Sequence, residues 1–480
     1  MKNINISIAL GLLTSFFVGC GGGSDANNVE LAKTIDLTKD FSSIPEYQRL
    51  WYFGALNMGD NRAELGGYSG DGIKVTIMGE EVDASHPELK NRVEKQYNTF
   101  AIKDKIVVGE ANQPYGFDKI GYGDGHGTHI AGTLAAECDN KGIVGVACGA
   151  KIDVYDLGIY GNSEKFIPTG WKHPDDYVTM FITGFASALD DITQKNVSKI
   201  VTGSFNIESP YFPLKEGGEL DNRSFYDLQQ KVENEIENID DFMTSSLFQF
   251  KNISDKENLK KILLTLPDED KLDTINGILM PKSQEWKMLE ESIQRYQQSD
   301  GVYIITESNN IFHTTSVLNA MPTISNKVDK DLWISAVLIS PKNFDDIKTL
   351  QGKKDAIHTS EWENIINDCG EVAQEYCVLI PSYNVISTMT QKVREAEDIF
   401  VTIDGYGYQM NTGHSMGAPM IAGALALMQE KNQKENLKLS MKALVRILKE
   451  SANRSFIGYN AKRHGQGILD VKAALEAMSK

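Results

Sequence analysis

Five short runs rich in β-branched residues recur along the 480-residue chain, with helical stretches between them. Continuous apolar strands that alternate with helices are typical of a mostly parallel sheet covered on both faces. We therefore predict an α/β fold whose chemistry lies beyond the carboxyl ends of the strands. The runs are IKVTIM at 73–78, KIDVYDLG at 151–158, KIVTGSF at 199–205, VYIITES at 302–308 and LWISAVLI at 332–339.

The net charge of the chain limits which kinds of binding partner we expect. The formal net charge is −18, and the chain has no long run of Lys and Arg. Nucleic acids and anionic membrane surfaces would repel such an acidic body, so we expect neither as a partner. The sequence does not set the oligomeric state.

The first residues predict export. An apolar stretch from Ile8 to Val18 is too short for a membrane-spanning helix, and 1–19 are therefore interpreted as a signal peptide. The sequence FVGC at 17–20 resembles the cleavage box of bacterial lipoproteins, in which Cys20 becomes lipidated. An ordinary signal peptide with an incidental Cys is the alternative. We expect a protein of the bacterial cell envelope, at the outer membrane or cell surface, that contacts the membrane only through its lipid.

Four cysteines remain after Cys20, namely Cys138, Cys148, Cys369 and Cys377. An even number in an exported protein predicts two disulfides, for which three connectivities exist. Short spacings favour Cys138 with Cys148 and Cys369 with Cys377. Four free buried thiols would be the alternative in a cytosolic protein.

The domain organisation follows from changes in pattern. Residues 20–44 are expected to form a linker after the lipidated Cys, and 45–480 a single catalytic-type domain. Charged, amphipathic sequence at about 207–285 interrupts the strand–helix rhythm, with apolar residues three and four positions apart. This periodicity predicts a helical insertion.

Two glycine-flanked segments contain candidate catalytic residues. In DGHGTHIAGTLAAE at 124–137, His126 stands at the first turn of a predicted helix, where it could act as a general base. A metal site with His129 is the alternative, but no Glu or Cys has a matching spacing nearby. In NTGHSMGAPMIAGALALM at 411–428, Ser415 begins a long apolar helix, whose N-terminal N–H groups favour an oxyanion. A lone serine there is more often a helix cap.

Together, HGTHIAGT and GHSMGAPMIAGA closely resemble the histidine and serine blocks of the subtilisin-like serine proteases, the subtilases. Further blocks follow in family order over about 45–205 and 285–475: DNKGIVGVACGAKI at 139–152, IPSYNVIST at 380–388 and GQGILDVKAAL at 465–475. The segment 367–382 also resembles a paired-Cys segment in subtilases of Gram-negative autotransporters, which supports the second disulfide.

The resemblance implies roles for matching positions. Ser415 would be the nucleophile and His126 the general base, while Asn309 would donate to the oxyanion. The strand Ser204, Phe205 and Asn206 would pair with an extended protein or peptide substrate. His414 beside the nucleophile departs from the family pattern and could crowd or hydrogen-bond the oxyanion site.

The most serious departure is in VTIMGEEVDASHPEL at 75–89. Aligned with the family block, Gly79 stands where the triad aspartate belongs. If the strand continues, alternation places Glu81 on the side of Gly79, so Glu81 is the predicted replacement acid, and Glu80 should point away. The triad is then expected to be weakened or reorganised.

A calcium site is a further implication of the resemblance. The family pattern suggests Glu88, Asp139 and Asn140 as ligands, but the set is incomplete, so a solvated loop is the favoured reading. No cofactor is required, and calcium would be a structural ion.

These observations favour an exported serine endopeptidase of reduced activity. Two other functions stay open. One is a catalytically inactive pseudoprotease that binds peptide in the cleft where a protease would bind its substrate. The other is a scaffold lipoprotein whose active surface is the insertion.

Overall fold

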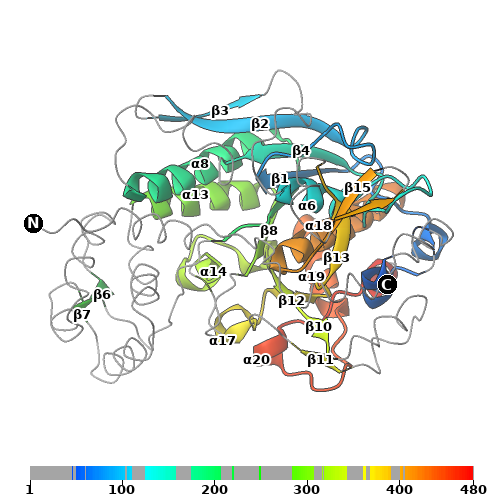
Figure 1. Ribbon diagram of the computed structural model, residues 1–480. Helices are drawn as coiled ribbons and strands as arrows, with labels where there is room; N and C mark the ends of the chain where they lie inside the picture. The colour runs from blue at the N-terminus through cyan, green and yellow to red at the C-terminus, as the bar shows by residue number, and fades with distance from the viewer. Residues whose placement is uncertain are drawn as a thin grey trace, which may run out of the picture.

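The computed structural model describes most of the chain outside the N-terminal region and the insertion (Figure 1). The described residues are 46, 50–59, 61–102, 105–110, 125–157, 174–206, 219–220, 248–249, 284–307, 316, 318–342, 361–363, 368–390, 400–403 and 406–478. The predicted signal peptide, the lipidated Cys20 and the linker lie outside them. Among the described residues, no helix has the length and apolarity needed to cross a membrane.

An eight-stranded sheet forms the centre of the fold, in the order β12-β9-β8-β5-β1-β4-β2-β3. Every described pairing in it is parallel except that of β2 with β3. The mostly parallel α/β prediction is therefore confirmed. The strands are β1 (Lys74–Gly79), β2 (Val93–Ile102), β3 (Lys105–Glu110), β4 (Lys151–Asp156), β5 (Ile200–Gly203), β8 (Val302–Thr306), β9 (Trp333–Leu338) and β12 (Cys377–Ile380).

All five runs predicted as strands lie in this sheet, each within two residues of its predicted ends. They are buried almost throughout, as strands covered on both faces must be. The pair β2 and β3 was not predicted. Its sequence, VEKQYNTFAI followed by KIVVGE, mixes charged and apolar residues and lacks the continuous apolar run of the other strands.

Two pairs of helices cover the sheet (Figure 1). Helices α8 (Pro174–Lys195) and α13 (Gln284–Gln298) pack on each other, and so do α6 (His126–Ala135) and α18 (His414–Lys434). On the α8 side, the ring of Tyr303 lies 5.1 Å from the rings of Phe185 and of Trp333, which joins helix, β8 and β9. The other described helices are α5 (Trp51–Ala55), η2 (Arg62–Leu65), α14 (Met321–Ile324), η4 (Lys330–Leu332), α17 (Gly370–Ala373), α19 (Met441–Ser451), α20 (Ala461–His464) and α21 (Val471–Ala477).

Three smaller sheets complete the described structure. The strands β13 (Val385–Thr388), β15 (Tyr406–Asn411) and β14 (Phe400–Ile403) form an antiparallel sheet, in that order. Strands β10 (Ser340–Pro341) and β11 (Trp362–Glu363) form a short pair. Of the predicted insertion, β6 (Glu219–Leu220) and β7 (Phe248–Gln249) pair antiparallel, and the predicted helices there lie outside the described residues.

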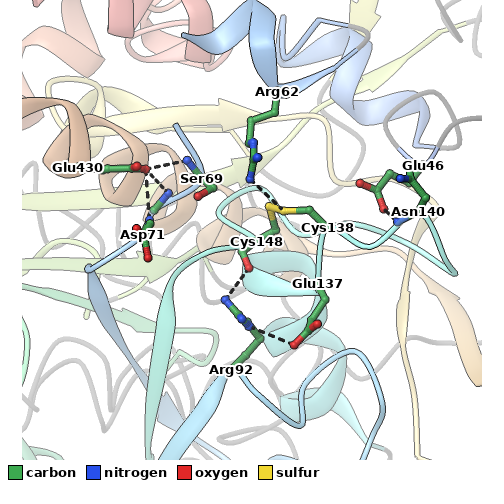
Figure 2. The surroundings of a disulfide bond; sticks show 11 residues. Glu46, Arg62, Ser69, Asp71, Arg92, Glu137, Cys138, Asn140, Cys148 and Glu430 are labelled. Carbon is green, nitrogen blue, oxygen red and sulfur yellow. Dashed lines mark hydrogen bonds and ion pairs between the residues drawn. A yellow bond between two sulfur atoms is a disulfide. The ribbon is translucent and has the colours of Figure 1, made fainter. Parts of the chain in front are cut away.

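The two predicted disulfides are present. Cys138 pairs with Cys148, and Cys369 with Cys377, with Cα atoms 5.6 Å and 5.7 Å apart. The first bond closes the loop between α6 and β4, and Figure 2 shows Arg92 holding this loop through the Cys148 carbonyl oxygen, at 2.8 Å. The short spacings predicted this connectivity because a disulfide needs Cα atoms within about 7 Å.

Candidate active site

Helix α6 begins at His126, as the glycine-flanked pattern predicts. The residue before it, Gly125, has a φ of 73°, a left-handed conformation that few residues other than Gly adopt readily. The His126 side chain is 2% exposed. The imidazole is therefore fixed at the N-terminal end of a buried helix.

The carboxylate of Glu80 fixes the orientation of this imidazole. His126 Nδ1 donates a hydrogen bond to Glu80 Oε1 over 2.5 Å, and Gly127 N donates to Oε2 over 3.0 Å. The Glu80 side chain is 9% exposed, so both contacts are shielded from water. A carboxylate that receives Nδ1–H fixes the tautomer and orients the ring, which is the role of the acid in a Ser-His-Asp triad.

The prediction that Glu81 would replace the acid, with Glu80 pointing away, is wrong. It assumed that the strand continues past Gly79, but β1 ends there. Gly79 has a φ of 139°, far from strand geometry, so side chains no longer alternate beyond it. The chain turns at Gly79 and brings Glu80 to His126. The empty aspartate position is thus refilled from the next residue, by a side chain one methylene longer.

Gly127 makes this approach possible. A Cβ atom built on it would lie 2.4 Å from the Glu81 carbonyl oxygen and 3.1 Å from the Glu80 Cβ atom. Only glycine leaves room for the backbone of 80–81 to lie against the first turn of α6. Any larger residue would push the Glu80 carboxylate away from the imidazole.

Helix α18 carries the predicted nucleophile at its second residue. Ser415 is fully buried, and Pro419 lies four residues later in the helix. Because proline has no N–H, the Ser415 carbonyl oxygen lacks its helical donor. The Ser204 hydroxyl replaces that donor over 2.9 Å, and Ser415 Oγ in turn donates to the Ser204 carbonyl oxygen over 3.4 Å. The end of β5 therefore holds the start of α18.

The sheet brings these two contacts together. Glu80 directly follows β1 and Ser204 directly follows β5, and the register pairs Met78 with Gly203. Neighbouring strands lie about 4.8 Å apart. The residues that hold His126 and Ser415 thus leave adjacent strands at the same carboxyl edge. Helices α6 and α18 also pack on each other.

The predicted substrate strand follows β5. Its side chains point to the interior: the Phe205 ring packs on Phe181 and Phe185 of α8, and the Asn206 amide donates to the Thr306 carbonyl oxygen. Pairing with a substrate would therefore use the backbone of this segment. The predicted oxyanion donor Asn309 lies outside the described residues.

Comparison with known proteins agrees with this geometry. Residues 70–168 match the profile described as the subtilase family. Over these residues, the chain is similar to the subtilase family. The match covers Glu80 and His126, and the blocks around Ser415 lie outside it.

Individual subtilases match over shorter stretches. Fervidolysin of Fervidobacterium pennivorans is 45% identical over 84 residues, which are 18% of this chain and 11% of fervidolysin. The major intracellular serine protease of Bacillus subtilis (strain 168) is 41% identical over 86 residues, 18% of this chain and 24% of that protease. Subtilisin DY of Bacillus licheniformis is 32% identical over 103 residues, 22% of this chain and 31% of subtilisin DY. The matches thus span less than a third of these relatives.

A solved structure extends the likeness in fold. The crystal structure of fervidolysin, described as a keratinolytic enzyme related to subtilisin, superposes with a TM-score of 0.53 at 18% identity. The superposition covers 92% of this chain and 48% of that one. It supports the subtilisin-like α/β fold.

Two further histidines lie near the candidate active site. His414 precedes Ser415, and its Nδ1 accepts a hydrogen bond from the Leu338 N–H over 2.8 Å. Burial lowers the pKa of His414 to about 3, so the ring is neutral and carries its proton on Nε2. It adds no positive charge beside the nucleophile.

His129 has a structural setting. Its Nε2 donates to the carbonyl oxygens of Val385 and Gln409, over 3.0 Å and 3.1 Å, which ties α6 to β13 and β15. Burial, together with the nearby His126, lowers the pKa of His129 to about 3. The ring is thus a neutral donor, in keeping with its interpretation as a structural neighbour of His126.

The suggested calcium ligands Glu88, Asp139 and Asn140 have the following surroundings in the structure. Glu88 Oε1 accepts hydrogen bonds from the Tyr408 hydroxyl and the Ile143 N–H, over 2.7 Å and 3.2 Å, and burial raises the pKa of Glu88 to about 8. Asp139 is exposed. The backbone N–H of Asn140 is bound by Glu46 over 2.7 Å (Figure 2). In the part of the chain that the structure describes, no three His, Cys, Asp or Glu side chains could hold a metal ion.

Sequence reasoning missed Glu80, and with it the turn at Gly79. A glycine between an apolar strand and two acidic residues was the available signal, since glycine commonly marks the point where a strand ends. The contact from Ser204 to Ser415 had a weaker signal. Pro419, inside an otherwise regular helix, indicates a carbonyl oxygen that needs another donor.

Proposed function

We propose that this protein is a subtilase, an exported serine endopeptidase whose triad consists of Ser415, His126 and Glu80. The observation that carries the proposal is the 2.5 Å hydrogen bond from His126 Nδ1 to the Glu80 carboxylate. A buried carboxylate that accepts the Nδ1–H of an imidazole has the arrangement that a Ser-His-acid triad requires. The triad is therefore reorganised around Glu80, and the acid position is not empty.

The reaction is the hydrolysis of a peptide bond through an acyl-enzyme. Ser415 Oγ attacks the carbonyl carbon while His126 Nε2 takes its proton, and Glu80 stabilises the imidazolium that results. The tetrahedral intermediate collapses, the C–N bond breaks, and His126 gives the proton to the leaving amine. Water, activated by the same imidazole, then releases the acid. No cofactor takes part.

The substrate proposed is a protein or peptide in an extended conformation. It would pair with the backbone of 204–206, and Asn309 would donate to the oxyanion. The N-terminal residues of α18, which include Ser415, would offer further N–H donors to the oxyanion. These assignments rest on the resemblance to the family and on the inward orientation of the side chains in that segment.

Export and a lipid anchor on Cys20 form a separate part of the proposal. They are supported by the apolar stretch that precedes Cys20 and by the two disulfides, which are rare in reducing compartments. In a Gram-negative host, the protein should fractionate with membranes, and Cys20→Ala should release it or block its maturation. Unchanged fractionation of the variant would refute the anchor.

Hydrolysis of an unfolded protein tests the central proposal. Purified wild type and Ser415→Ala should be incubated with reduced, alkylated casein, and new N-termini identified by mass spectrometry. We expect cleavage by the wild type only. Equal cleavage by both proteins would point to a contaminating protease. Absence of cleavage, with retained binding of casein peptides, would favour a peptide-binding pseudoprotease instead.

A further inference from the structure

Residues 80–83, the segment that carries Glu80, lie outside the hydrogen-bonded ladder of the sheet. The last ladder-type contact of β1 is the hydrogen bond from Leu157 N to the Gly79 carbonyl oxygen, over 3.0 Å. The backbone turns at Gly79, which has a φ of 139°. Pairing with a neighbouring strand therefore does not fix the position of Glu80. A triad acid must nevertheless hold its position within about 0.5 Å. Other contacts have to supply that precision.

One side chain replaces the missing strand partner. Gln96 Oε1 accepts a hydrogen bond from Val82 N over 3.2 Å, and Gln96 Nε2 donates to the Val82 carbonyl oxygen over 2.8 Å. The amide thus satisfies both backbone groups of a single residue, as a neighbouring strand would. Gln96 is 1% exposed, and its own backbone is paired with Val154 of β4. This side chain is therefore anchored in the rigid sheet.

A second contact joins the same segment to the helix of the catalytic histidine. Asp83 N donates to Thr128 Oγ1 over 2.9 Å, and Thr128 lies two residues after His126. That contact would let the segment move together with α6. Of the side-chain contacts described above, the one from Gln96 is the one that fixes the segment relative to the sheet.

We propose that Gln96 is a positioning residue, which holds the backbone of Val82 so that the Glu80 carboxylate meets His126. This inference rests on the proposed function, because it assigns Gln96 to the triad formed by Glu80. Gln96 does not touch the reacting atoms. It acts through two backbone hydrogen bonds, two residues after the acid.

The chain offers a matched control in Gln297 of α13. Its amide also hydrogen-bonds both backbone groups of a single residue. Oε1 accepts from Asp329 N over 2.8 Å, and Nε2 donates to the Asp329 carbonyl oxygen over 2.9 Å. Nε2 also donates to the Leu332 carbonyl oxygen over 3.2 Å. Gln297 is also buried, at 6% exposure, and lies on a different helix pair from the site. Loss of either amide should affect folding alike, but only the loss of Gln96 should affect the triad.

The test compares Gln96→Met with Gln297→Met, since methionine keeps the volume and removes both hydrogen bonds. Turnover is measured per active site, titrated with a fluorophosphonate, and the Glu80 to His126 Nδ1 distance is measured in crystal structures of both variants. We expect kcat to fall about 10²-fold in Gln96→Met, because a misplacement of 1 Å can cost that much. KM should stay within about twofold, since ground-state binding of the substrate is not changed. Gln297→Met should keep the wild-type kcat.

The two readouts separate this inference from the proposed function. If the wild type cleaves no peptide, the proposed function fails, and the distance in Gln96→Met still decides the inference. Displacement of the Glu80 carboxylate by about 1 Å in Gln96→Met alone supports it. An unchanged Glu80 position, or an equal loss of kcat in both variants, overturns it. If Gln96→Met does not fold, Gln96→Glu provides the same comparison, because it keeps the acceptor and loses the donor.

Discussion

Replacement of Glu80 by glutamine is the sharpest perturbation of the site. The variant keeps the shape of the side chain and an oxygen for Gly127 N, and it removes the negative charge beside His126. The new NH2 group, turned towards Nδ1, would also favour the wrong imidazole tautomer. The change therefore separates the electrostatic role of Glu80 from its packing.

The expected loss of kcat follows from the contact between Glu80 and His126. At about 4 Å between charge centres and an effective dielectric constant of about 20, a carboxylate stabilises an imidazolium by about 4 kcal/mol. This corresponds to about 10³-fold in rate. Loss of the aspartate in subtilisin, which also disturbs the tautomer, costs about 3 × 10⁴ in kcat. We therefore expect Glu80→Gln to lower kcat by about 10³- to 10⁴-fold.

The assay is hydrolysis of a quenched fluorescent peptide chosen from the casein cleavage sites, with Glu81→Gln as the matched neighbour. The Glu81→Gln variant should keep kcat within about threefold of the wild type, because Glu80 and not Glu81 makes the contact described with Nδ1. The reasoning is refuted if Glu81→Gln loses activity and Glu80→Gln retains it. It is also refuted if both variants match the wild type.

Three further predictions concern the frame of the site. Ser204→Ala leaves the Ser415 carbonyl oxygen without its hydroxyl donor and should cost about 1–3 kcal/mol in the free energy of unfolding, measured with urea; no loss would contradict this. Gly79→Ala forces a side chain into a φ of 139° and should cost about 1–3 kcal/mol in the same assay, whereas equal or higher stability would show that the turn is not strained. His129 and His414 are neutral in the folded protein, with pKa values of about 3, and titrate near 6.5 when unfolded. The stability that they contribute is complete above pH 6.5 and decreases as the pH falls, by about 2 kcal/mol for each ring at pH 5. His129→Gln should halve this part of the pH dependence in urea titrations, and an unchanged slope would contradict the assignment.

Much of the fold could be predicted from the sequence because its signals are local. Continuous apolar runs such as 73–78 and 302–308 indicate buried parallel strands, and cysteines ten or fewer residues apart suggest their own partners. The helix starts at His126 and next to Ser415 were also predicted, since Gly125 and Gly413 precede the two helices. Pairs such as β2 and β3, with mixed polarity, give no such signal.

The carboxylate that contacts His126 could not be assigned correctly in the same way. Strand alternation favoured Glu81, but it holds only while the backbone remains a strand, and one dihedral angle at Gly79 decided between the two glutamates. The role of Gln96 gives no sequence signal either. Its partner, Val82, is defined by a turn and by the register of two strands, which are properties of the tertiary structure.

The most direct measurement of the central claim is covalent labelling of Ser415 by a fluorophosphonate, followed by mass spectrometry of the labelled peptide. The reagent reacts with a serine that a positioned base activates, so it reports on the triad without knowledge of the substrate. We predict one labelled serine, Ser415, with a labelling rate that falls about 10³-fold or more in Glu80→Gln. No labelling of the wild type above that of Ser415→Ala would contradict the account.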